Sequence, residues 1–136
     1  MNNPVNSFLG KINEHLDYDL TFLTSCIETL KSDLESLLVD VDVQVTKNLM
    51  EAIGYQVLNV TSQYIIVEKR SKRVALLFSD ELDKSIDVTV IVKVNRETIK
   101  TLIFDYLLDY LCDKYDTLTF NVAAFQHVKG IFYHNE

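Results

Sequence analysis

The stretch LDYDLTFLTSCIETLKSDLESLLVDV, residues 16–41, carries a regular repeat of apolar residues. An apolar residue returns after every fourth and then every third position, at Leu16, Leu20, Leu23, Ile27, Leu30, Leu34, Leu37 and Val41. Because an α-helix completes one turn in about 3.6 residues, this spacing keeps the apolar side chains on one face. The stretch therefore predicts a long amphipathic helix that organises the front half of the chain.

The same repeat is typical of coiled coils, and the residues beside the stripe distinguish the two structures. With Leu16 at position d of a heptad, the e and g positions hold four aspartates and one lysine, and no g–e′ pair between parallel helices is an ion pair. In an antiparallel pair the aspartates would face one another and repel. Cys26 and Leu38 widen the apolar face, which favours packing within one domain. A dimer built on this helix is the alternative.

The residues before this stretch continue its helical spacing. Asparagine is a common N-cap and proline suits the first helical position, so Asn3-Pro4 predicts a helix start. One helix can run from about residue 4 to residue 38, or Gly10 or the cluster at 17–19 can divide it into two. The sequence leaves both alternatives open.

The middle of the chain changes from a helical period to a period of two. Residues 39–45 alternate valine with polar residues as a strand would, but we favour a helix over Val43–Ile53, because Asp42 can cap it and Gly54 can end it. Beyond this helix, alternating apolar residues predict strands at 55–60, 63–68, 74–79 and 86–94. The short links between them predict an antiparallel meander of three to five strands, with residues 69–73 as a hairpin link.

A second long helix is expected over Arg96–Tyr115, capped by Asn95. After it, alternation resumes at 118–122, and residues 130–133 form a last apolar segment, so short C-terminal strands are predicted. The fold class is therefore α+β: a long N-terminal amphipathic helix or helix pair, an antiparallel meander, a long helix near the C-terminus and short C-terminal strands. We expect residues 1–136 to form a single domain.

The composition is that of a globular protein. Apolar residues make up 48% and charged residues 24% of the chain, with only three glycines and one proline. No apolar run approaches the roughly 18 residues that span a bilayer, and the first residues lack the pattern of a signal peptide. Cys26 and Cys112 lie in helical apolar patterns, where reduced thiols are usual. We therefore expect a cytoplasmic protein without a membrane partner.

Aspartates on the last predicted helix are the first candidate binding site. The chain has a net charge of −7, which repels nucleic acid and attracts basic partners. Four carboxylates fall within an arc of about 80° on that helix, opposite its apolar face. Because like charges at this spacing repel, we interpret the group as a contact for a basic partner, with a solvated helix face as the alternative. Its members are Asp105, Asp109, Asp113 and Asp116.

A basic run at the predicted hairpin link is the second candidate. It consists of Lys69, Arg70, Lys72 and Arg73. Cations at this density can contact nucleic acid phosphates or a protein partner. No aromatic residue is interleaved with them as a stacking surface requires, so we favour a solvated hairpin tip whose charge discourages sheet pairing.

Signatures of catalysis and cofactor binding are missing from the sequence. The order of helix, meander and lysine-ended strand resembles the PD-(D/E)xK nuclease core, but Ile91 stands two residues before Lys93 where that core needs an acidic metal ligand. His15, His127 and His134 have no zinc-site spacing, and no glycine-rich phosphate loop or nucleophile elbow occurs. We predict no enzyme, no metal and no cofactor.

Two hypotheses on function follow from these features. The first is a small acidic cytosolic protein that inhibits, neutralises or escorts a protein partner, as toxin-immunity proteins, secretion chaperones and phage-encoded inhibitors do. The second is a structural subunit that assembles with itself through the Leu16–Val41 helix or a sheet edge. The lack of interhelical ion pairs at the e and g positions favours the first hypothesis.

Overall fold

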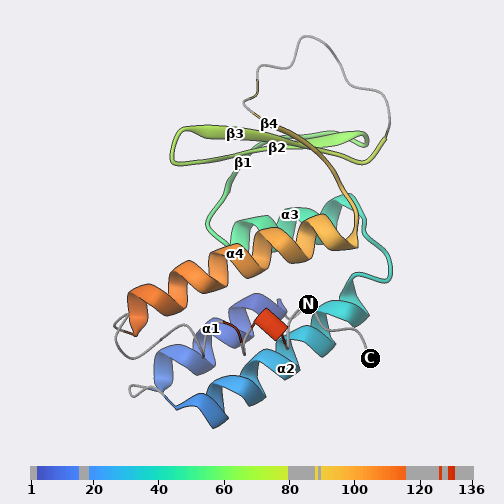
Figure 1. The fold of residues 1–136 in the computed structure, drawn as a ribbon. Coiled ribbons are helices and arrows are strands. Elements are labelled where there is room, and N and C mark those ends of the chain that lie inside the picture. Colours follow the sequence, from blue (N-terminus) through green and yellow to red (C-terminus); the bar gives the residue numbers. More distant parts are fainter. Residues whose placement is uncertain are drawn as a thin grey trace. The chain divides into compact units, whose positions relative to one another are not determined.

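Two separate helices form the N-terminal part of the structure, which is a computed structural model. The structure describes residues 3–15, 19–79, 88, 90–115, 126, 129 and 130. Helix α1 spans Pro4–Glu14 and helix α2 spans Leu20–Leu37 (Figure 1). Gly10 lies inside α1, and the chain leaves the helical conformation only after Glu14. The alternative with a helix pair is therefore the correct one.

Side-chain caps begin both helices. The Asn3 Oδ1 atom accepts a hydrogen bond from the Val5 N–H at 3.0 Å, and Pro4 occupies the first turn of α1. At α2, the Asp19 Oδ1 atom accepts from the N–H groups of Thr21 and Phe22, at 3.0 and 3.2 Å. The aspartate that divides the two helices is thus also the cap of the second one.

The apolar stripe of α2 is buried over a shorter range than the heptad pattern predicts. Four of its members, Leu23, Ile27, Leu30 and Leu34, are at most 2% exposed. Cys26 is also buried, which confirms the wide apolar face. Leu20 is 40% exposed, and α2 ends at Leu37, so Val41 does not belong to this helix. Leu16 lies outside the described residues.

Helix α3, Val43–Ala52, confirms the helical interpretation of the ambiguous valine segment. The Asp42 Oδ1 atom accepts from the Val45 N–H at 2.8 Å, and the Thr46 hydroxyl donates to the Asp42 carbonyl at 2.9 Å. Gly54 follows the helix with a φ of 92°, in the left-handed region that favours glycine at a helix end.

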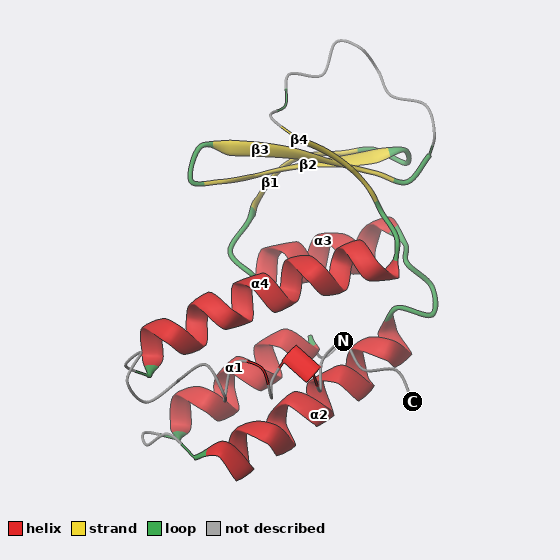
Figure 2. Cartoon of the chain, viewed as in Figure 1, coloured by secondary structure: helices red, strands yellow, loops and turns green. Residues whose placement is uncertain are grey.

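A four-stranded sheet follows, in the order β1-β2-β3-β4 (Figure 2). Its strands are β1 Gln56–Val60, β2 Tyr64–Lys69, β3 Lys72–Leu77 and β4 Val90–Lys93. The first three strands pair in an antiparallel manner, as predicted, with a bulge at Leu58 where the register of β1 shifts. Helix α3 contacts β1 and β2. Ile65, Val67 and Leu76 share one face of the sheet and are buried.

The prediction of an antiparallel meander is wrong for β4, which pairs parallel to β3. Val74 lies opposite Val90, and Leu77 lies opposite Lys93. A parallel neighbour requires a crossover of about a dozen residues or more rather than a tight turn. Apolar residues alternate with the same period of two in parallel and in antiparallel strands, so the sequence pattern could not show which way β4 pairs with β3. The linking residues 80–87 lie outside the described part of the chain.

Helix α4, Arg96–Lys114, begins at a reciprocal cap. The Thr98 N–H donates to the Asn95 Oδ1 atom, and the Asn95 N–H donates to the Thr98 hydroxyl oxygen, both at 2.9 Å. The predicted C-terminal strands fall on residues that the structure does not describe, except that Gly130, at the start of the second, is helical.

The chain divides into two compact units. The helical unit consists of Met1–Ser36 and Leu102–Glu136, and the sheet unit consists of Leu37–Thr101. Helix α4 thus begins in the sheet unit and ends in the helical unit. Within the helical unit, the Tyr110 hydroxyl on α4 donates to the Asn13 Oδ1 atom on α1. That the whole chain acts as a single domain stays a prediction.

Candidate protein-binding surfaces

Three aspartates form a row along the exposed side of α4, which we call the acidic row. Asp105, Asp109 and Asp113 are all exposed and follow one another at four-residue intervals. Each interval corresponds to a rise of about 6 Å along the helix. The buried side of the same helix carries Ile103, Leu107 and Leu111, each at most 1% exposed. The structure thus brings together three of the four predicted aspartates, and Asp116 lies outside the described residues.

The acidic row does not stabilise its own helix. Carboxylates four residues apart repel one another, and Asp113 lies near the C-terminal end of α4, where the helix dipole disfavours negative charge. Lys114, the cation next to Asp113 in the sequence, makes a cation–π contact with Tyr115, with its ammonium 5.6 Å from the centre of the ring. The row is therefore a feature that folding alone does not favour.

The acidic row affects the pKa of the Cys112 thiol. Its pKa is raised above the ordinary value, first because burial disfavours the thiolate and then because the carboxylates of Asp109 and Asp113 repel it. Burial likewise raises the pKa of Cys26, against a smaller lowering by the Lys11 ammonium. A raised pKa leaves less thiolate at neutral pH, so both thiols are weak nucleophiles.

The net charge of the protein resides entirely in the helical unit. This unit contains 11 acidic and 4 basic residues, a net charge of −7. The sheet unit contains 9 acidic and 9 basic residues and is neutral, which accounts for all 20 acidic and 13 basic residues of the chain. The sequence analysis missed this division, because the helical unit combines two segments from opposite ends of the chain.

The basic run is less available for binding than its sequence indicates. The Lys69 Nζ atom donates to the Ile53 carbonyl at 2.9 Å and lies 5.3 Å from the centre of the Tyr55 ring. The Arg73 Nε atom donates to the Glu68 Oε2 atom at 2.9 Å. Arg70 and Lys72 remain exposed at the end of the hairpin. Two of the four cations thus have hydrogen-bond partners within the protein.

The turn between β2 and β3 has an unusual backbone for its residues. Lys69 pairs with Lys72, so Arg70 and Ser71 form a two-residue loop. Their φ angles are 53° and 65°, as in a type I′ turn, which normally holds Asn-Gly because side chains with a Cβ atom are strained there. Arg70 and Ser71 thus hold a backbone conformation that glycine would adopt at lower energy.

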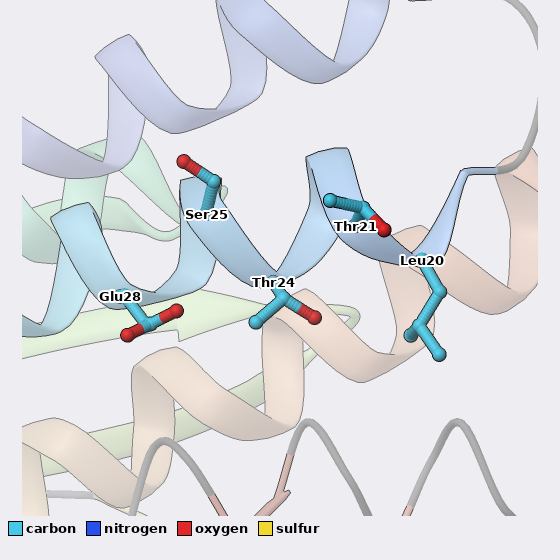
Figure 3. A pocket seen from close by; sticks show the side chains of 5 residues that line it. All are labelled: Leu20, Thr21, Thr24, Ser25 and Glu28. Carbon is cyan, nitrogen blue, oxygen red and sulfur yellow. The ribbon is translucent and has the colours of Figure 1, made fainter.

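A shallow hollow of about 380 Å³ lies against α2. Its lining residues in the described part of the chain are Leu20, Thr21, Thr24, Ser25 and Glu28. Leu20, Thr24 and Glu28 extend from one side of the helix, and Thr21 and Ser25 extend from the neighbouring side (Figure 3). Hydroxyl groups and one carboxylate offer hydrogen bonds, but no histidine or cysteine among these side chains can activate a nucleophile. These five side chains by themselves supply no nucleophile with an adjacent base.

Metal binding and membrane insertion find no support in the described residues. Among them, no three histidine, cysteine, aspartate or glutamate side chains are grouped so that they could hold a metal ion. The His15 ring instead stacks on Phe22, with 4.1 Å between ring centres, and His127 and His134 lie outside the described part. None of the helices searched in that part has the length and apolarity to cross a membrane.

Comparison with known proteins identifies no family: no protein-family model, no curated protein and no solved structure matches this chain. The two charged surfaces are the features of this chain that bear on its function. The acidic row is rigidly placed on a helix and lies in the unit that carries all of the net charge. Such a surface can attract and orient a cationic partner.

Proposed function

We propose that this protein binds a basic protein partner through the helical unit and that it acts without catalysing a reaction, as an inhibitor, neutraliser or escort. The observation that carries the proposal is the division of charge, with −7 on the helical unit and none on the sheet unit. A charge concentrated in one unit of a protein steers an oppositely charged partner toward that unit and raises the rate of association.

The acidic row is the part of this surface that we propose to meet the partner. Its carboxylates are exposed and regularly spaced, and the buried residues on the other side of α4 hold the helix in place. Charge-assisted hydrogen bonds from arginine or lysine would relieve the repulsion between these carboxylates. A cytoplasmic location, with both thiols reduced, belongs to the same proposal.

The test is capture of partners from the native host by the tagged protein at about 50 mM and about 300 mM salt. We expect a basic protein to be captured in stoichiometric amount at the lower salt concentration and to be lost at the higher one. The D109N/D113N variant should capture less of it, because the acidic row is then weakened by two charges. The D40N/E51Q variant makes the same change in net charge on exposed residues of the sheet unit and should capture as much as the wild type.

Equal loss in both variants would show that net charge alone is responsible and would contradict the role of the acidic row. Capture of no protein, or of an acidic protein whose amount does not change with salt, would contradict the proposed function as a whole.

Self-assembly through α2 or a sheet edge is the second candidate function. The buried stripe of α2 already packs within the chain, which leaves the sheet edges as the more accessible route. In the described sheet the outermost strands are β1, which carries the bulge, and β4. Bulges discourage edge pairing, so β4 is the edge that this alternative requires. Sedimentation equilibrium tests it, and a monomer at tens of micromolar would contradict it.

A further inference from the structure

The tip of the β2–β3 hairpin presents two cations on a strained but well-anchored turn. Arg70 and Ser71 have left-handed backbone conformations, with φ angles of 53° and 65°. The bonds from Lys69 to the Ile53 carbonyl and from Arg73 to Glu68 fix the strands on either side. Strained residues persist where the surrounding structure holds them and commonly mark a binding function. Arg70, Ser71, Lys72 and Arg73 are all exposed, and of the three cations among them Arg73 is bonded to Glu68.

The chemistry of the tip favours a carboxylate-bearing surface over a nucleic acid. Residues 68–73 contain no aromatic side chain on which a base could stack. Two cations would also neutralise few phosphates, and the net charge of −7 opposes the approach of a polyanion. A short series of carboxylates on a protein matches two neighbouring cations better.

The acidic row of α4 is such a series. Its carboxylates are separated by a rise of about 6 Å along the helix. Arg70 lies in the two-residue loop and Lys72 is the first residue after it, so the tip offers two neighbouring cations to neighbouring carboxylates of the row. We infer that the hairpin tip of one copy of this protein contacts the acidic row of a second copy, in a weak head-to-tail association. The contact does not require the basic partner proposed above, although it would compete with that partner for the same row.

Exposed ion pairs contribute little affinity, and the net charges of two copies repel, so the association is expected to be transient. At about 0.1 M salt, charges more than about 10 Å apart are largely screened, whereas ion pairs in direct contact are screened less. Moderate salt therefore weakens the repulsion between copies more than it weakens the contact. Salt of about 0.5 M should then weaken the contact as well.

Carbodiimide cross-linking tests the inference, since it joins a lysine to a carboxylate that is in ion-pair contact with it. Equal amounts of unlabelled and ¹⁵N-labelled protein are mixed at about 0.1 M salt, and mass spectrometry separates links between copies from links within one copy. We expect mixed-isotope links from Lys72 to Asp105, Asp109 or Asp113. They should disappear at about 0.5 M salt and in the R70E variant.

Matched controls keep the result specific. Lys47 should give no mixed links to the acidic row, and Lys72 should give none to Asp40 or Glu51, which are exposed on the sheet unit. Taken alone, the R70E/K72E variant and the D109K/D113K variant should each lose the mixed links between position 72 and positions 109 and 113. A mixture of the two variants should regain them with the charges exchanged.

Links from Lys72 to the row that occur only within one copy, the absence of mixed links, or equal linking from Lys47 would each overturn the inference. These outcomes leave the proposed function intact, because capture of a basic partner is tested with residues of α4 alone. Conversely, loss of that capture does not affect the links made by Lys72.

The R70N/S71G variant separates a binding role from a structural one. Asparagine and glycine suit both positions of the turn, so this variant should resist unfolding at least as well as the wild type. We expect its links between Lys72 and the acidic row to decrease severalfold, because one of two cations is removed. Unchanged linking in a folded variant would show that Arg70 has no part in the contact.

Discussion

The helical unit and the sheet unit differ in charge and in the path of the chain. The helical unit carries −7 and is assembled from the two ends of the sequence, whereas the sheet unit is neutral and continuous from Leu37 to Thr101. Both contain fully buried leucines, such as Leu34 and Leu76. The comparison teaches that charge and hydrophobic packing are distributed independently, because packing requires the interior and charge requires only the surface.

The two units also differ in where the backbone is strained. In both units the described helices start from polar side-chain caps, which are low-energy arrangements. In the sheet unit, Arg70 and Ser71 hold a turn conformation that glycine would adopt more easily. The charged surfaces differ in the same way: the acidic row of the helical unit lies on a regular helix, whereas the exposed cations Arg70 and Lys72 of the sheet unit lie at a strained turn.

The largest effect is expected from the cores, where the two units should behave alike. L34A in the helical unit and L76A in the sheet unit each remove a side chain that is fully buried. Each should lower the free energy of unfolding by about 3 kcal/mol, because a cavity is left in addition to the lost burial. Urea unfolding followed by circular dichroism measures the change.

Two exposed leucines provide matched controls for these variants. Leu20 and Leu58 are both 40% exposed, one in each unit. L20A and L58A should each cost less than about 1 kcal/mol. A loss under 1 kcal/mol for either buried leucine would show that its unit is less well packed than the other.

A smaller effect of opposite sign is expected at the strained turn. R70N/S71G should raise the free energy of unfolding by about 1 kcal/mol, because the new residues relieve the left-handed strain. S71A keeps a side chain with a Cβ atom at the second position and should give no such gain. Thermal or urea unfolding of the three proteins measures the difference, and a loss of stability in R70N/S71G would show that the turn is not strained.

The smallest effect concerns the charge of the helical unit and uses Cys112 as a reporter. Its raised pKa means that less thiolate is present at a given pH than in an unfolded chain. D109N/D113N removes the repulsion of the thiolate, so iodoacetamide should modify Cys112 faster, and the pH midpoint of the reaction should move lower.

Peptide mass spectrometry separates the modification of Cys112 from that of Cys26, which is buried and should react at an unchanged rate. The D40N/E51Q variant should leave the rate at Cys112 unchanged. An identical pH profile in D109N/D113N would show that burial alone raises the pKa.

Local chemistry predicted most of the secondary structure. Asn3, Asp42 and Asn95 cap the helices that the sequence assigned to them, because an N-cap depends on neighbouring residues only. Strands β1 to β3 form where alternating apolar residues predict strands, although burial alternates clearly only in β2. The heptad pattern was less accurate at its ends, since α2 stops at Leu37 although the spacing continues to Val41.

The candidate surfaces were only partly predictable. Exposure of Asp105, Asp109 and Asp113 follows from helical spacing, and the sequence found all three. The bond of Lys69 was not visible, because its partner, the Ile53 carbonyl, lies 16 residues away in the chain. The bond of Arg73 to Glu68 depends on the register of the hairpin, in which the two residues lie opposite each other. The proposals on function remain as predictions that the experiments above test.

By itself, the sequence determined the starts of α1, α3 and α4, the wide apolar face of α2, the β2–β3 hairpin and the row of aspartates on α4. Each of these features depends on residues within a few turns of one another. Only the tertiary structure decided that β4 runs parallel to β3, that the ends of the chain join in one unit, and that this unit carries the whole net charge. The reason is physical: strand direction and the assignment of surface charge to a unit depend on contacts between distant segments, and the local period of apolar residues is the same for either outcome.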